Sequence, residues 1–183
     1  EQVELQRPGA LQLEREVGAV LRAFAGTTLF VSHNRDEVYR LCDRISVVDD
    51  GRLSVTDEKW ALFRRPRTYA AALLTGCKNI SRAERAGEFA LRALDWGGIT
   101  LQTREPVTDA VRFVGVRARQ IEAAADPARP NRFAFSAVEA VEDTFSHIRM
   151  IVPDAAGLSG EIQLLRWELP KRTGEAPPPP HGY

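Results

Sequence analysis

The spacing of hydrophobic residues gives the first part of the chain a mainly helical pattern. Apolar residues recur every three or four positions in stretches that predict helices over residues 11–24, around residues 60–63 and over residues 69–74. The Pro8-Gly9 step is expected to break this pattern, so that the first ten residues are irregular. Core packing is expected for Trp60 and Phe63. The first helix should face a sheet with its apolar stripe, which consists of Val17, Val20, Leu21 and Phe24.

From about residue 80 the pattern changes to alternation of apolar and polar residues, which is typical of strands. Short strands separated by turn residues indicate a small barrel or sandwich, and the change of pattern places a domain boundary between residues 76 and 82. We therefore expect domains at residues 1–78 and 79–175, followed by a proline-rich, disordered tail at residues 176–183. The six strand candidates are residues 89–94, 98–103, 110–117, 133–141, 147–152 and 161–169.

The junction around His33 is the most informative local pattern. Residues 28–31 are apolar or β-branched without polar alternation, which predicts a parallel strand buried on both faces. Asn34 and Glu37 form a helix N-cap and capping-box pair, so a helix begins directly after His33. A strand end beside a helix N-terminus is where α/β proteins bind phosphate groups. From the chemistry alone, a histidine that merely satisfies a strand end is an equally good interpretation.

Composition and charge narrow the classes of function. The chain is 44% hydrophobic, and its 25 basic residues equal its 25 acidic ones. This balance argues against a dedicated surface for nucleic acid or acidic membranes. Cys42 and Cys77 are too few for a disulfide framework, no Cys/His cluster has metal-ligand spacing, and Cys42 is expected to be a small core residue. No apolar run approaches the roughly 20 residues that span a bilayer.

The segment TLFVSHNRDEVYRLCDRISVVDDGRL resembles the switch segment, or H-loop, of ABC ATPases, and the similarity extends over about residues 15–80. This resemblance implies that residues 1–78 are part of a RecA-like P-loop NTPase domain of α/β fold. It also implies that His33 contacts the γ-phosphate of ATP, with Mg²⁺ bound in the full-length subunit. The implied partners are a second copy of the subunit, transmembrane permease subunits and, indirectly, a substrate-binding protein, at the cytoplasmic face of the cell membrane.

The continuation LFRRPRTYAAALLTGCKNIS resembles the exit from this ATPase domain in importers with a C-terminal accessory domain. Its GCKN step is most similar to the molybdate importer branch, so the implied function is ATP-driven uptake of an oxyanion, with molybdate preferred and sulfate or tungstate as alternatives. The all-β part resembles the OB-like TOBE barrel of such importers. The alternative function is a non-catalytic, oxyanion-sensing regulatory module.

Several motifs of the resembled family are absent from this sequence. It has no G-x-x-x-x-G-K-[ST] phosphate loop and no LSGGQ-like signature. Residues 45–50 imitate a Walker B strand, but they follow His33, whereas the family's Walker B precedes it, and Asp50-Gly51 predicts a hairpin turn. We therefore expect the chain to be the C-terminal part of a longer ATPase, inactive and without cofactor when alone.

The barrel carries a candidate oxyanion site in the turn between two strands, because a tetrahedral dianion needs several convergent donors. Its residues are Thr144, Ser146 and His147, although the preceding Glu142 and Asp143 would repel an anion. The alternative is a structural module. Binding of single-stranded nucleic acid is disfavoured because the aromatic residues are expected to point into the core; these are Phe113, Phe133, Phe135 and Phe145.

Overall fold

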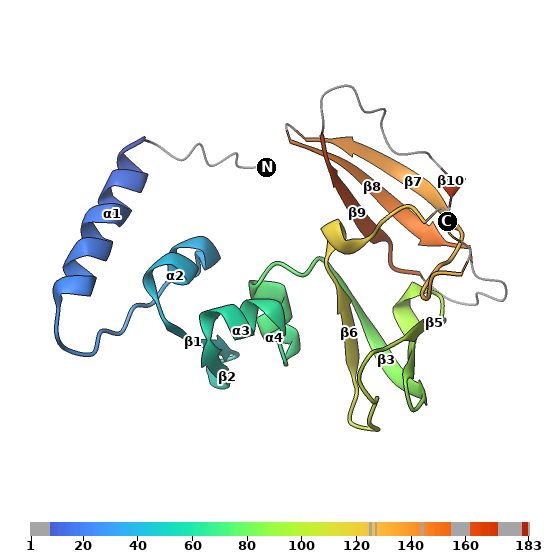
Figure 1. Ribbon diagram of the computed structural model, residues 1–183, viewed down its shortest axis with the longest axis horizontal. Coiled ribbons are helices and arrows are strands. Elements are labelled where there is room, and N and C mark those ends of the chain that lie inside the picture. Colours follow the sequence, from blue (N-terminus) through green and yellow to red (C-terminus); the bar gives the residue numbers. More distant parts are fainter. Residues whose placement is uncertain are drawn as a thin grey trace. The chain divides into compact units, whose positions relative to one another are not determined.

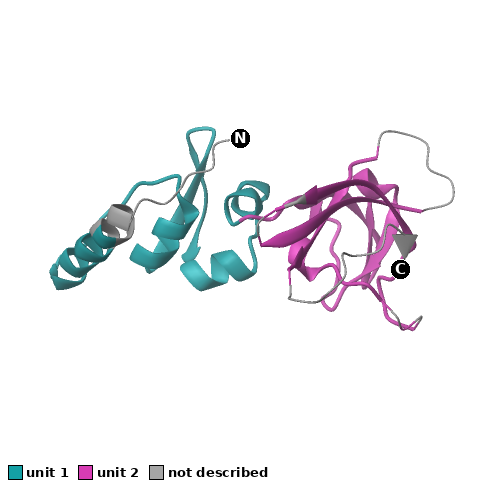
Figure 2. Cartoon of the chain, turned by 90° about the horizontal axis from the view of Figure 1, so that it is seen from above, with its two compact units in different colours: residues 1–75 teal, residues 76–183 magenta. Residues whose placement is uncertain are grey.

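The computed structural model describes residues 8–124, 126, 128–143, 145–154, 162–171 and 181–182. The chain divides into two compact units, Glu1–Thr75 and Gly76–Tyr183, which Figure 2 colours separately. Within the described residues, no helix is both long and apolar enough to cross a membrane.

Unit 1 combines helices with one antiparallel hairpin (Figure 1). Three residues, Val47, Leu62 and Ala71, form its small core, with partly buried apolar residues packed around them. All the helices predicted from the sequence are present, including the one after Asn34. The elements are α1 (Pro8–Ala23), α2 (Arg35–Leu41), β1 (Arg44–Asp49), β2 (Arg52–Glu58), α3 (Lys59–Arg64) and α4 (Tyr69–Leu74).

The turn between β1 and β2 confirms the interpretation of Asp50-Gly51. Both residues have positive φ angles, 46° and 71°, as a two-residue hairpin turn of type I′ requires. Asp49 therefore ends an antiparallel strand that pairs with Arg52, rather than a buried parallel strand of Walker B type.

Two predictions about the start of the chain are wrong. The structure describes α1 from Pro8 onward, so residues 8–10 are helical rather than irregular, while residues 1–7 of this prediction lie outside the described residues. The stripe of α1 is not covered by a sheet, because Val20 is 69% and Phe24 60% exposed.

The predicted parallel strand at residues 28–31 is also wrong for this structure, because the segment is irregular and Leu29 and Val31 are 90% and 85% exposed. A strand needs a neighbour for its backbone hydrogen bonds, and the described strands of unit 1, β1 and β2, pair only with each other. Trp60 and Cys42 were expected in the core, but Trp60 is 58% exposed and Cys42 is only half-buried, so both expectations are wrong.

Unit 2 contains two four-stranded antiparallel sheets (Figure 1). The first has the order β5-β4-β3-β6 and the second the order β10-β7-β8-β9. Short 3₁₀ helices η1 (Leu94–Trp96) and η2 (Ala118–Gln120) follow β4 and β6. The strands are β3 (Asn79–Gly87), β4 (Ala90–Ala93), β5 (Ile99–Gln102), β6 (Phe113–Val116), β7 (Phe135–Glu142), β8 (Ser146–Pro153), β9 (Leu165–Pro170) and β10 (His181–Gly182).

All six strand candidates correspond to strands, but the prediction of a closed barrel is wrong. Backbone ladders do not join the described edges of one sheet to those of the other, so the two sheets stay separate. Strand β3 had no hydrophobic signature because its buried positions are Asn79, Ser81 and Ala83, which are polar or small. In the tail, His181 and Gly182 pair with Ser136 and Phe135, contrary to the expected disorder; residues 176–180 and 183 lie outside the described residues.

Side chains from both sheets form one core in unit 2. Phe135 of β7 meets Trp167 of β9 edge to face, with ring centroids 5.5 Å apart. The indole N–H of Trp167 donates to the carbonyl oxygen of Ile121 at 2.8 Å. Two aromatic residues predicted to point inward do not, because Phe113 is 48% and Phe145 77% exposed.

Candidate functional site

His33 lies in a bend immediately before α2, and its side chain is exposed. Within the described part of the chain it makes no hydrogen bond or ion pair, so its imidazole is available to an external group. Its position is fixed by its two neighbours, Ser32 and Asn34, which belong to the helix cap.

The cap of α2 is a closed network of short hydrogen bonds. The Asn34 side-chain oxygen accepts from the backbone N–H groups of Asp36 at 3.0 Å and Glu37 at 3.3 Å. The Glu37 carboxylate accepts from the Ser32 hydroxyl at 3.0 Å and from the Asn34 amide at 3.1 Å, while the Asn34 N–H donates to the Ser32 oxygen. The predicted pairing of Asn34 with Glu37 is confirmed, although Glu37 bonds to side chains rather than to the Asn34 backbone.

This cap limits the number of hydrogen-bond donors that the start of α2 has free for a phosphate. Because Asn34 already satisfies two N–H groups of the first turn, the helix end has fewer free donors than the sequence suggested. The exposed imidazole of His33 remains as a donor or acceptor at the surface. Among the described residues no group of three or more potential metal ligands occurs.

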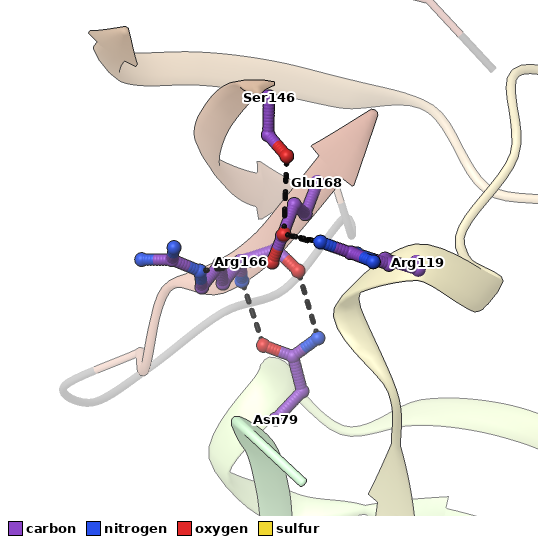
Figure 3. A network of polar contacts seen from close by, with 5 residues as sticks. All are labelled: Asn79, Arg119, Ser146, Arg166 and Glu168. Carbon is purple, nitrogen blue, oxygen red and sulfur yellow. Dashed lines mark hydrogen bonds and ion pairs between the residues drawn. The ribbon is translucent and has the colours of Figure 1, made fainter. Parts of the chain in front are cut away.

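Of the residues predicted to bind an oxyanion, Ser146 already has a carboxylate partner, which Figure 3 shows. Ser146 is 1% exposed and donates its hydroxyl to the carboxylate of Glu168 at 3.3 Å. His147, the next residue of β8, is half-buried and belongs to the other face of the strand. Thr144 lies outside the described residues. The oxyanion site stays a prediction, to which the position of Ser146 gives no support.

Glu168 is the centre of an ion-pair cluster that sequence reasoning missed. Arg119 donates to one carboxylate oxygen from Nε at 3.0 Å and from its terminal nitrogen at 2.8 Å, and Arg166 lies 3.7 Å from the other oxygen. Burial raises the pKa of Glu168, but the hydrogen bond and charge of Arg119 outweigh this effect, with help from Ser146, so the pKa lies below its usual range. The donors of this cluster therefore bind the Glu168 carboxylate rather than an external anion.

Asn79, which the sequence analysis also did not single out, joins the two sheets of unit 2 (Figure 3). Its amide nitrogen donates to the carbonyl oxygen of Arg166 at 2.9 Å, and its amide oxygen accepts from the Arg166 N–H at 2.7 Å. These two bonds imitate one step of a β-ladder between β3 and β9, where no ladder connects the sheets. Asn79 is 2% exposed.

A second polar contact holds the start of η1 to β3. Asp95 is 8% exposed and accepts from the Arg82 backbone N–H at 2.6 Å and from Arg82 Nε at 2.8 Å. The Asp95 N–H donates to the Ser81 hydroxyl oxygen at 2.9 Å. The hydrogen bond from Arg82 lowers the pKa of Asp95 below its usual range, against the opposing effect of burial.

The chain is similar to ATP-binding subunits of ABC importers. It is 29% identical over 117 residues to the Fe(3+) ions import ATP-binding protein FbpC of Streptomyces coelicolor, covering 62% of this chain and 33% of the relative. It is 32% identical over 88 residues to the uncharacterized ABC transporter ATP-binding protein YdcT of Escherichia coli, covering 44% and 26%. The spermidine/putrescine import ATP-binding protein PotA of Thermobifida fusca is 28% identical over 130 residues, covering 68% and 30%.

The chain spans about a quarter to a third of the length of these relatives. Two of the matches are longer than either compact unit, so the similarity crosses the boundary between them. Other relatives are named for import of sulfate/thiosulfate and of methionine. No family model matches the chain. The chain therefore has homologues, at modest identity, among import ATP-binding subunits.

Proposed function

We propose that this chain is the C-terminal part of the ATP-binding subunit of an ABC importer, in which residues 1–78 complete the nucleotide-binding domain and unit 2 is an accessory domain. In the complete subunit, His33 contacts the γ-phosphate of Mg-ATP at a dimer interface. Hydrolysis of this ATP is coupled to a conformational change in the transmembrane permease subunits, which the subunit contacts at the cytoplasmic face of the membrane. The observation that carries this proposal is the similarity to import ATP-binding subunits across both units.

The geometry around His33 supports its assigned role. The imidazole is exposed, whereas the residues on both sides of it are held by the Ser32–Asn34–Glu37 network. Because the backbone around His33 is already held, only the side-chain torsions of the imidazole have to be ordered on contact with a phosphate, which lowers the entropic cost of that contact. The cap keeps Glu37 bonded to Ser32 and Asn34, so its carboxylate is directed to the protein rather than to the ligand.

The exposed segment at residues 28–31 supports the same assignment. Leu29 and Val31 are almost fully exposed although the sequence pattern is that of a strand buried on both faces. Burying each side chain against the remainder of a nucleotide-binding domain contributes about 1.5–3 kcal/mol. We propose that this segment is a strand of the parallel sheet in the complete domain, which would place His33 at its carboxyl end.

A chimera tests the role of His33. Residues 15–80 of this chain replace the matched segment of the E. coli YdcT protein, and nucleotide binding and ATP hydrolysis are measured separately. We expect His33→Ala to reduce hydrolysis at least about 100-fold, since positioned proton-transfer and charge-stabilising groups contribute effects of this size. Nucleotide affinity should change only severalfold.

Arg35→Ala in the same chimera is the matched control, because Arg35 is an exposed neighbour of the cap whose ion pair with Asp36 is 3.5 Å long and contributes little. It should hydrolyse ATP at the rate of the parent chimera. Full turnover by the His33→Ala chimera would remove the role assigned to His33, and an equal loss in both variants would point to damage of the helix rather than to a phosphate contact.

The imported substrate is a separate part of the proposal. An oxyanion, with molybdate preferred, follows from the resemblance of the GCKN step, and one relative is named for sulfate/thiosulfate import. None of the relatives named above carries molybdate in its name. Transport assays of the complete system with labelled molybdate, tungstate and sulfate decide the substrate; uptake of none of them would end the oxyanion assignment and leave the role of His33 intact.

A further inference from the structure

Glu37 makes two hydrogen bonds that the cap of α2 does not require. In a capping box, the acid at the third helical position accepts from the backbone N–H of the N-cap residue. Here the Ser32 hydroxyl oxygen accepts from that N–H, which belongs to Asn34, at 3.0 Å. The Asn34 side chain in turn accepts from the N–H groups of Asp36 and Glu37. These three N–H groups therefore have partners without the Glu37 carboxylate.

The carboxylate instead holds the two residues that flank His33. One oxygen accepts from the Ser32 hydroxyl at 3.0 Å, and the other accepts from the Asn34 amide at 3.1 Å. These bonds close a ring that runs from Glu37 through Ser32, along the backbone to Asn34 and back. Ser32, Asn34 and Glu37 are half-buried, whereas the His33 side chain is exposed. His33 thus belongs to the ring through its backbone alone.

A carboxylate suits this position because both of its oxygens are acceptors. Glutamine would place one acceptor and one donor where the structure uses two acceptors, so it reproduces one of the two bonds. Alanine reproduces neither. Substitutions of Glu37 by glutamine and by alanine therefore remove the bonds of the ring in steps, while the N–H groups of the helix start keep their partners.

We infer that Glu37 is a positioning residue for His33. It acts through the histidine rather than on the nucleotide, because its bonds to Ser32 and Asn34 fix the backbone from which the imidazole reaches the γ-phosphate. This inference rests on the function proposed above for His33. A misplacement of about 1 Å at a reacting group can lower a rate about 100-fold, so loss of the ring should lower hydrolysis and leave nucleotide affinity unchanged.

The effect on the backbone is tested on the full chain without nucleotide. ¹⁵N relaxation gives the order parameter of the His33 N–H, for which about 0.85 marks a rigid backbone and values below about 0.6 mark motion on the ps–ns timescale. The order parameter should be about 0.85 in the parent chain and below about 0.6 in Glu37→Ala. An equally rigid His33 in both chains overturns the inference, whatever the rate of hydrolysis.

Asp36→Ala is the matched control for Glu37→Ala. It removes the same charge from the neighbouring residue of α2, at an exposed position outside the ring of side-chain bonds. The ion pair of Asp36 with Arg35 is 3.5 Å long and contributes little. Asp36→Ala should therefore leave the His33 order parameter at the parent value, and an equal fall in both variants would overturn the specific role of Glu37.

The effect on hydrolysis is tested in the chimera that carries residues 15–80. Glu37→Ala should lower ATP hydrolysis about tenfold and nucleotide affinity less than about twofold, with Glu37→Gln between the parent and the alanine variant. In the His33→Ala background, Glu37→Ala should lower the residual hydrolysis less than about twofold, because the carboxylate acts only through the histidine. Asp36→Ala should hydrolyse ATP at the rate of the parent chimera.

Ser32 provides an independent check of the ring. Ser32→Ala removes the hydroxyl that donates to Glu37 and accepts from the Asn34 N–H, so it should also lower hydrolysis about tenfold. Ser32→Thr keeps a hydroxyl with the same donor and acceptor groups and should retain at least about half of the parent rate. Equal losses in the two variants would overturn the part assigned to this hydroxyl.

The outcomes separate this inference from the proposed function. Parent-level hydrolysis by Glu37→Ala, or an equal fold loss with and without His33, overturns the inference. A loss in His33→Ala without any loss in Glu37→Ala ends the inference alone. Full hydrolysis by His33→Ala ends the proposed role of His33 and the positioning role of Glu37 together.

Discussion

Asn79 offers a sharp test of how the two sheets of unit 2 are held together. Its amide forms both hydrogen bonds to the backbone of Arg166, at 2.7 and 2.9 Å, and it is 2% exposed. Asn79→Ala removes both partners at once. The Arg166 N–H and carbonyl groups then lose these bonds at a part-buried position, where water replaces them less readily than at the surface.

The cost follows from the number of groups left unpaired. A buried donor or acceptor that loses its partner costs about 1–3 kcal/mol, so the two groups together should lower the unfolding free energy of unit 2 by about 2–6 kcal/mol. This is a large share of the 5–15 kcal/mol that is typical of whole domains.

Urea unfolding in the Trp60→Phe background measures this loss, because the remaining tryptophans, Trp96 and Trp167, both belong to unit 2. Asn131 supplies a matched control, since its amide makes the same pair of bonds to one backbone residue, Gln102, but at an exposed position. The control variant is Asn131→Gly, because glycine keeps the positive φ without strain.

We expect Asn131→Gly to cost less than about 1 kcal/mol, as water can take over the lost bonds. If Asn79→Ala costs no more than Asn131→Gly, burial does not set the value of these bonds and the bridge between β3 and β9 is not a determinant of stability.

Three further changes test other contacts. Arg82 lowers the pKa of Asp95, so the stabilisation from this pair is complete above the unfolded pKa of about 4 and is lost as the pH falls through the lower folded pKa. Urea unfolding of the Asp95→Asn variant should lack this acid dependence. A pH profile of stability equal to that of the parent chain would contradict the pairing. Asn34→Ala should destabilise α2 by about 1 kcal/mol in thermal melts followed by far-UV circular dichroism, whereas an unchanged melt would show that the cap contributes nothing. Glu168→Gln should lower the urea-unfolding free energy of unit 2 by about 2 kcal/mol, because it weakens charge-assisted bonds from Arg119; a neutral effect would count against the ion-pair cluster.

The candidate site at His33 was partly predictable because its signals are local. Asn34 and Glu37 are three residues apart, and their capping interaction needs no distant partner. The exposed position of His33, by contrast, depends on whether residues 28–31 have neighbouring strands. No spacing within the segment contains that information, and its apolar pattern predicted burial that the described structure does not provide.

In unit 2, alternation predicted strands wherever apolar side chains face the core. It missed β3, whose inward positions Asn79 and Ser81 are polar and are satisfied by bonds to Arg166 and Asp95, far along the chain. It also could not tell a closed barrel from two sheets, because both arrangements bury the same alternate positions. The sequence pattern did not predict the Glu168 cluster either, because its partners Arg119 and Ser146 lie on other elements, distant in the sequence.

The sequence by itself determined the helices of unit 1, the Asp50-Gly51 turn, the cap beside His33 and six of the strands, because each depends on periodicity or on residues within one turn of each other. Tertiary structure decided the rest. It left residues 28–31 without a described neighbouring strand, kept the two sheets separate and made Asn79 a polar connection between them. These features arise from contacts between distant residues, whose free energies depend on burial and on partners that no local pattern specifies.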